Sequence, residues 1–238
     1  MVKINHFDII KILITLICTG LGAGLPDGIL SFLAAINVLT IGIIHGANDL
    51  YIASKIKRTV SKHQFSYLFG IYILFVFVMV FALYSFPLYS LLLFVIISSF
   101  HFGEQQWYQK TIVKSVKLYI FYAAFGFLFF ALLFYTHKLH TANIIFEITQ
   151  QQVPNFFFDR FTIFASILTT FLLIINFKQI KSQLFVQTIG LLSLLFLFSQ
   201  TSLIWSFSVY FVLWHSLPSL KDQASVLYPY DSSPIRSY

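Results

Sequence analysis

The sequence predicts an all-α membrane protein, a polytopic bundle of about eight transmembrane helices with little mass outside the bilayer. Of its 238 residues, 58% are hydrophobic and only 10% are charged, whereas soluble proteins carry about 25% charged residues. A soluble domain of this size has too little interior to bury so much apolar surface. We expect a single integral-membrane domain over residues 1–238.

Apolar stretches near the length that crosses a bilayer, about 20 residues, recur along the chain. The predicted spans are 9–25, 29–51, 65–86, 88–107, 113–135, 156–177, 184–199 and 203–217. Stretches such as 121–134 are apolar on all sides, which is typical of a helix in lipid. The alternation of polar and apolar residues expected of barrel strands is missing from them.

The connections contain turn residues or polar residues. Pro26-Asp27-Gly28 follows the first span and predicts a tight turn. No small-residue cleavage site follows that span, so we expect it to be retained rather than removed as a signal peptide. The longest polar stretch, 136–155, predicts a connecting loop, with or without an interfacial helix.

The basic residues indicate an orientation. With these spans, all of the 15 Lys and Arg residues except Lys138 and Arg160 fall on one side of the bilayer. The positive-inside rule then places both termini in the cytoplasm, and we expect the chain in the cell inner (cytoplasmic) membrane. The net charge of +7 is explained by this asymmetry, so no nucleic acid is expected as a partner. The single cysteine, Cys18, excludes an intrachain disulfide.

Histidines inside the spans are the strongest candidates for function. Of the seven, His45, His101 and His215 lie in predicted spans at comparable depth, in the expected cytoplasmic half. Ionisable residues within a membrane are costly and ordinarily mark function. The other histidines fall in tails or loops, where no special role is expected; they are His6, His63, His137 and His140.

Each of the three intramembrane histidines begins a polar stripe on its helix. The stripes carry Asn48 and Asp49 after His45, Glu104, Gln105 and Tyr108 after His101, and Pro218, Ser219 and Asp222 after His215. A single histidine near the end of a span is ordinarily a hydrogen-bonded interface residue. Three at matched depth, each with polar neighbours, favour one shared site.

Imidazole binds iron, zinc, copper or nickel, and carboxylates serve as further ligands or orient the histidines. A histidine set without thiolates and with open coordination positions fits non-haem iron chemistry. Zinc and a haem held by two histidines remain alternatives. Intramembrane histidines and carboxylates also form proton relays, so a proton-coupled transporter is a further alternative, although no convincing internal repeat supports it.

Three motifs, His45-Gly46-Ala47-Asn48-Asp49, Phe100-His101-Phe102-Gly103-Glu104 and Trp214-His215-Ser216, resemble in order and position those of the Brp/Blh family. These are bacterial and archaeal membrane β-carotene 15,15'-dioxygenases. The resemblance implies that non-haem Fe(2+) and O2 split the central double bond of β-carotene. The product, two molecules of all-trans-retinal, would supply a microbial rhodopsin.

The resemblance also implies roles for individual residues. His45, His101 and His215 would bind the metal, and Asp49 and Glu104 would accept hydrogen bonds from the ligand imidazoles or hold a water molecule. One departure is Ser219, which stands where the family typically has a second histidine, four residues after the first. Three histidines still leave open coordination positions on iron. Asp222, Glu104 or water are candidates for the fourth ligand.

Neighbouring residues carry further expectations. Pro218 cannot donate a backbone hydrogen bond to the carbonyl of Trp214. Gly46 and Gly103 leave room for substrate or for close helix approach. Trp107 and Trp214 are either interface anchors or pocket walls. Membrane desaturases and hydroxylases are disfavoured because they need more histidines, in clusters such as HxxxH.

Overall fold

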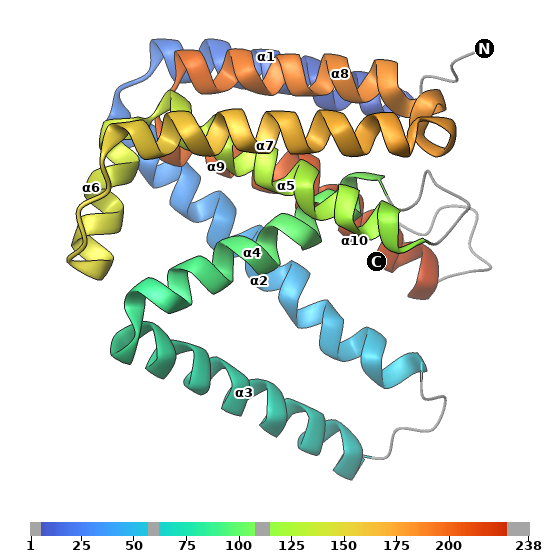
Figure 1. The fold of residues 1–238 in the computed structure, drawn as a ribbon. Coiled ribbons are helices and arrows are strands. Elements are labelled where there is room, and N and C mark those ends of the chain that lie inside the picture. The colour runs from blue at the N-terminus through green and yellow to red at the C-terminus, as the bar shows by residue number, and fades with distance from the viewer. Residues whose placement is uncertain (1–5, 57–61, 108–114, 228–238) are drawn as a thin grey trace.

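The computed structural model is a bundle of helices, with no strand among the residues it describes, which are 6–56, 62–107 and 115–227 (Figure 1). The side chains of residues 43, 45–56, 62–65 and 226 lie outside the description. The helices are α1 (His6–Gly24), α2 (Asp27–Ile56), α3 (Lys62–Ser85), α4 (Pro87–Trp107), α5 (Val116–Thr136), α6 (Lys138–Thr149), α7 (Asn155–Ile175), α8 (Phe177–Gln200), α9 (Leu203–Tyr210), the π-helical segment η2 (Phe211–Ser216) and α10 (Leu217–Leu227).

The prediction of an all-α, multi-span protein is confirmed. Seven helical stretches in the described part of the chain are long and apolar enough to cross a membrane. They match every predicted span except the second, 29–51, which falls in the continuous helix α2. The apolar stretch found there is Asp27–Gly42, and most of the predicted span beyond Gly42 lies outside the described side chains. The predicted turn is present, because α1 ends at Gly24 and the carbonyl of Pro26 accepts hydrogen bonds from the first turn of α2.

One predicted boundary is wrong, and the helix allowed for in the predicted loop 136–155 is present. Helix α8 begins at Phe177 rather than at residue 184, so its first turns contain Lys178 and Lys181. Long basic side chains reach the interface while their stems stay apolar, so they do not end a helix. The predicted loop 136–155 contains helix α6, which ends at Gln150 in a left-handed conformation (φ 57°).

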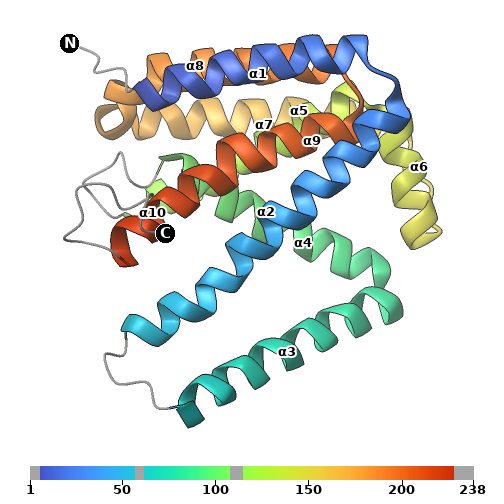
Figure 2. The same cartoon turned by 180° about the vertical axis from the view of Figure 1, so that it is seen from behind.

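The helix ends alternate between two sides of the bundle. The first residues of α1 and α3 and the last residues of α2 and α10 lie on one side, at the right in Figure 1, and α6 lies on the other. The view from behind shows the same division (Figure 2). These are the ends from which the basic segments continue in the sequence, as the predicted orientation requires.

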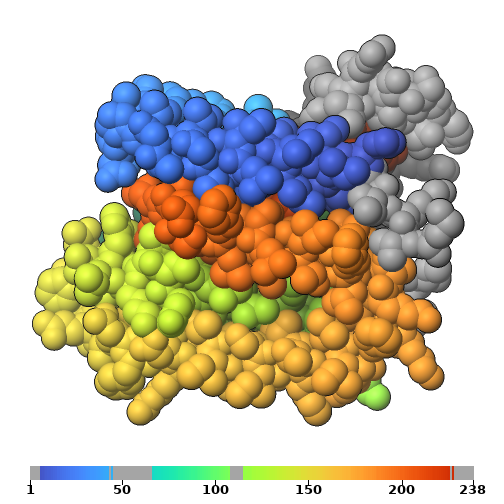
Figure 3. Space-filling model, turned by 90° about the horizontal axis from the view of Figure 1, so that it is seen from above, coloured from blue at the N-terminus to red at the C-terminus, as the bar shows by residue number. Residues whose placement is uncertain are grey.

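Helix α1 is polar inside and apolar outside. Its buried residues are Asp8, Lys11, Thr15 and Thr19, whereas residues such as Leu13 (54% exposed) and Ile17 (61%) form its outer surface. This arrangement is stable only where the surroundings are as apolar as lipid. It packs against α8, which lies between α1 and α7 when the molecule is seen from above (Figure 3).

Helices α4 and α5 approach each other very closely. At Gly103 of α4 a Cβ atom would lie 2.6 Å from the carbonyl carbon of Tyr122, and at Gly126 of α5 it would lie 2.7 Å from Cα of Ser99. Small residues allow such backbone contact in membranes, where packing replaces the hydrophobic effect as the main attraction between helices. Hydroxyl groups join α5 to α7, since Thr169 donates to the carbonyl of Ala124 (2.9 Å).

The last span, α9–η2–α10, is the most buried of the candidate spans, with 61% of its apolar window inside the protein. Helix α2 packs along all three of its parts. The π-helical turn is closed by the N–H of Leu217, which donates to the carbonyl of Val212. Pro218 has no N–H for the carbonyl of Trp214, so the usual α-helical pairing is broken beside this wider turn.

Candidate functional site

His101 and His215 lie against each other where α4 meets η2. His101 comes from α4 and His215 from η2, and their ring centroids are 4.7 Å apart with the rings nearly perpendicular (72°). His215 is buried (2% exposed), whereas His101 is exposed. The pair therefore has one closed side and one accessible side.

The separation of these two rings tests which metal group they fit. With a metal–nitrogen bond of about 2.1 Å, two imidazoles bound at right angles to one ion have centroids roughly 4.5 Å apart. Axial ligands on opposite faces of a haem would have centroids separated by roughly 6 Å. The observed 4.7 Å is close to the separation expected for a shared ion, and it is also an ordinary separation for two rings in edge contact.

His45 lies on α2, which packs against η2 and α10, the helices around His215. Its side chain, and those of Asn48 and Asp49, are outside the described residues. Within the described side chains, no group of three metal-binding residues comes together. The structure thus brings two of the three predicted ligands together, and the assignment of all three stays a prediction.

The carboxylates near the pair lie at different places. Glu104 is half-buried one turn beyond His101, and no hydrogen bond in the described part of the chain joins it to His101 or His215. Asp222 of α10 accepts a hydrogen bond from Nε2 of Gln105 (2.8 Å). This bond ties the polar stripe of α4 to that of α10. The catalytic roles predicted for Asp49 and Glu104 stay predictions.

Aromatic side chains enclose His215. The ring of Phe102 lies 4.6 Å from the His215 ring, and that of Phe211 lies 5.7 Å from it. Phe102 in turn stacks on Phe130 of α5 (5.6 Å, 19°). These contacts exclude water from the buried face of the imidazole, where electrostatic interactions are stronger than in solution.

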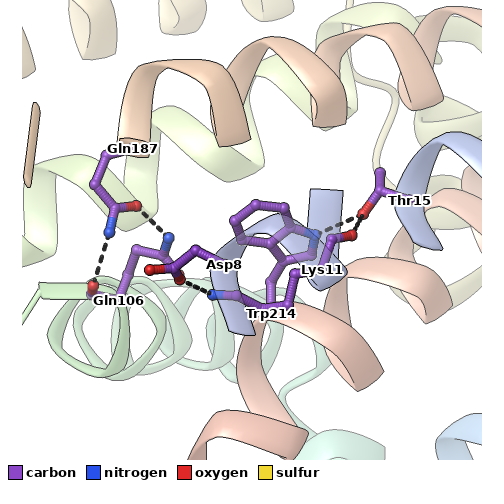
Figure 4. A network of polar contacts seen from close by, with 6 residues as sticks. All are labelled: Asp8, Lys11, Thr15, Gln106, Gln187 and Trp214. Atoms are coloured by element: carbon purple, nitrogen blue, oxygen red, sulfur yellow. Dashed lines mark hydrogen bonds and ion pairs between the residues drawn. The ribbon is translucent and has the colours of Figure 1, made fainter. Parts of the chain in front are cut away.

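A polar network beneath Trp214 was not predicted from the sequence (Figure 4). Nε1 of Trp214 donates to Oγ1 of Thr15 (2.9 Å), and Nζ of Lys11 lies 4.6 Å from the centroid of the Trp214 ring. Lys11 also pairs with Asp8 at 3.0 Å. Trp214 precedes His215 directly, so helix α1 supports the histidine segment. The spacing of Asp8, Lys11 and Thr15 on one helical face was the available signal.

A second unpredicted contact joins α4 to α8, where the side-chain amides of Gln106 and Gln187 are hydrogen-bonded (Figure 4). Nε2 of Gln187 also donates to the backbone carbonyl of Gln106 (3.4 Å). Buried amides in lipid need such partners because water cannot supply them. The pair holds the α4 turn that follows His101 against α8.

Several expectations about neighbouring residues are now decided. Trp107 is neither an anchor nor a pocket wall, because it is 1% exposed and packs on Phe121 at 5.1 Å. Gly103 serves close helix packing. His137 is held by the carbonyls of Leu133 (2.9 Å) and Thr201 (2.8 Å), a structural role.

Comparison with known proteins gives one match. A family model described as beta-carotene 15,15'-dioxygenase matches residues 36–237 of the chain. This range includes both histidines of the close pair and residues 36–56 of α2, and it leaves out α1. No curated protein and no solved structure matches the chain significantly.

Proposed function

The chain belongs to the β-carotene 15,15'-dioxygenase family, and from this premise we propose that it cleaves the central 15,15' double bond of β-carotene with O2. The products would be two molecules of all-trans-retinal. The observation that carries the proposal is the close approach of the exposed His101 and the buried His215 on two helices of an apolar, multi-span bundle. An apolar substrate dissolved in the bilayer reaches such a site without a water-filled channel.

We further propose that His45, His101 and His215 hold a non-haem Fe(2+) ion. When bound, the ion would bind and activate O2. Without such activation, a polyene does not react with O2 at a useful rate. The spacing of His101 and His215 supports a shared ion. Three imidazoles leave coordination positions open, so Ser219 in place of a fourth histidine does not prevent this chemistry.

The surrounding residues position and protect the pair. Phe102 and Phe211 hold the buried face of His215 away from water. The Gln105–Asp222 hydrogen bond links α4, which carries His101, to α10, which directly follows the η2 segment of His215. Asp49 and Glu104 would accept hydrogen bonds from ligand imidazoles or hold a water molecule, as such partners commonly do around metals.

The proposed setting of the reaction follows from the substrate and product. Both are apolar, so the polytopic bundle would exchange them directly with the inner membrane in which we expect it. Retinal would pass to a microbial rhodopsin as its chromophore. The expected cytoplasmic position of both termini belongs to the same proposal.

The test is expression in cells that accumulate β-carotene, followed by pigment extraction. We expect bleaching with accumulation of retinal for the native chain, and intact β-carotene for His101→Ala and His215→Ala. His140→Ala is the matched control, because His140 is exposed on α6 and outside the proposed site. Equal bleaching by all variants would refute the site, and no bleaching by the native chain would refute the reaction.

Purified protein separates the proposed metal from its rivals. We expect about one iron per chain and no Soret band. A Soret band would support the haem alternative, and metal-free protein with proton-coupled uptake in vesicles would support the transporter.

A further inference from the structure

An apolar cavity of about 630 Å³ lies between α4, α5, α6, α7 and α9. Its volume is within the range of pockets for small organic ligands, about 300–1,000 Å³. Leu88 and Val95 line it from α4, Phe130 from α5 and Phe207 from α9, and Val153 closes it from the α6–α7 connection. We call it the apolar groove.

Two pairs of aromatic rings lie between the groove and the histidine pair. Phe130 lines the groove and stacks on Phe102 (5.6 Å), which lies 4.6 Å from the His215 ring. Phe207 also lines the groove and stacks on Phe211 (5.8 Å), which lies 5.7 Å from the same ring. The groove therefore ends one aromatic ring short of His215 on each path, and a long ligand in the groove reaches the pair when Phe102 or Phe211 moves aside.

The position of the groove suits an extended ligand. Its lining on α4 runs from Leu88 to Ile96, and His101 lies further along the same helix, roughly 20 Å from Leu88 at about 1.5 Å per residue. The wall is partly open to the surroundings, since lining residues such as Phe94 (49% exposed) and Ile204 (42%) also form the outer surface. A ligand can therefore enter sideways from lipid.

The wall favours a flat ligand over a flexible acyl chain. Phe157 and Phe161 lie parallel to each other (16°, centroids 6.0 Å apart) and both line the groove. Planar aromatic faces make more simultaneous contacts with a rigid conjugated chain than with a chain that rotates about every bond. A rigid polyene also loses less conformational entropy on binding.

We infer that the apolar groove binds one ring end and the adjoining half of the carotenoid polyene, and that Leu88 and Val153 determine the ring size that it admits. This inference rests on the proposed function, because the other half of the polyene must continue past His101 and His215. The ring lies beside α6, and the central double bond lies at the histidine pair.

The first test measures binding without catalysis. Metal-free protein in nanodiscs is titrated with β-carotene, which quenches tryptophan fluorescence by energy transfer. We expect Val153→Phe and Leu88→Phe to weaken binding about tenfold, since added side-chain volume in a filled pocket is poorly tolerated. Gln151→Phe is the matched control, because Gln151 is exposed on the same connection and does not line the groove.

The second test measures cleavage of two substrates. β-Carotene has a ring at each end, whereas 8'-apo-β-carotenal has one ring and one truncated end that fits a narrowed groove. We expect Val153→Phe to lower kcat/KM for β-carotene about tenfold. We expect its kcat/KM for the apocarotenal to stay within about threefold of the native value. Equal loss on both substrates would indicate a general structural defect and overturn the inference.

The two tests separate the inference from the proposed function. Suppose that the native chain binds β-carotene, that Val153→Phe and Leu88→Phe weaken this binding, and that none of them cleaves it. The proposed function then fails, and the assignment of the groove as a carotenoid site holds. If the native chain cleaves β-carotene while Val153→Phe and Leu88→Phe bind and cleave it normally, the groove is wrong and the function stands. Equal competition by an acyl lipid would mean that the groove is only a lipid site, which also overturns the inference.

Discussion

Gly103 lies two residues beyond His101, at the point where α4 and α5 are in backbone contact. A Cβ atom at this position would lie 2.6 Å from the carbonyl carbon of Tyr122, closer still to its oxygen, and 3.2 Å from the backbone nitrogen of Gly126. No side-chain rotation relieves these contacts, because the atoms that Gly103→Ala would meet are backbone. The two helices must separate by roughly 1 Å for ordinary van der Waals contact.

The expected cost has two parts. Overpacking against rigid neighbours costs about 1–3 kcal/mol. The upper end applies here because backbone atoms, unlike the tip of a side chain, move only when the whole helix is displaced. A loss of about 3 kcal/mol lowers Tm by about 10 °C in a chain of this size. The displaced helix also carries His101, and a shift of about 1 Å in a reacting group can reduce activity about 100-fold.

The assay combines thermal unfolding of detergent-purified protein with retinal formation from β-carotene. Gly70→Ala is the matched control, because a Cβ atom there meets nothing within 4 Å. It should match or slightly exceed the native Tm, since Ala is favoured over Gly in a helix by up to about 1 kcal/mol. Gly126→Ala should behave like Gly103→Ala, as it faces the same contact from α5.

The reasoning is refuted if Gly103→Ala has the native Tm and the native activity. A lowered Tm with full activity would be informative in a narrower way. It would confirm the packing of α4 on α5 and remove the argument that this packing positions His101.

Three further predictions concern the surroundings of His215. Trp214→Phe should lower stability by about 1–2 kcal/mol in thermal unfolding, because Oγ1 of Thr15 loses its indole donor; an unchanged Tm would contradict the network. A double-mutant cycle of Gln105→Ala and Asp222→Ala should show a coupling of about 1 kcal/mol, and additive effects would mean that the bond does not join α4 to α10. Treatment with an Fe(2+) chelator should abolish retinal formation, with recovery on adding Fe(2+) but not Zn²⁺; full activity in chelator would contradict the proposed ion.

Much of the helical organisation was predictable because membranes impose simple constraints. Lipid requires each span to satisfy its own backbone hydrogen bonds, so an apolar stretch of sufficient length is a helix. The polarity of α1 was also present in the sequence, since Asp8, Lys11 and Thr15 recur at helical spacing. The role of this polar face was not evident from the sequence, because it depends on the side chain that the face contacts. That side chain is Trp214, about 200 residues away in the chain.

The π-helical turn at Phe211–Ser216 could not be predicted from local sequence patterns. Pro218 predicted a missing hydrogen bond in this region, but not the wider turn, which depends on how α2 and α4 pack around His215. The same limit applies to Trp107, whose amphipathic side chain suits an interface as well as a core. Its burial against Phe121 follows from the close approach of α4 and α5.

The sequence by itself determined that the chain is built for a lipid bilayer, roughly where its spans lie, and which residue types are available for chemistry. These properties depend on the length, polarity and order of residues. Only the tertiary structure decided that His101 and His215 are 4.7 Å apart, that α1 supports Trp214, and that an apolar groove forms between α4, α5, α6, α7 and α9. Distances between helices far apart in the chain arise from side-chain packing summed over the whole bundle. No single segment carries that information.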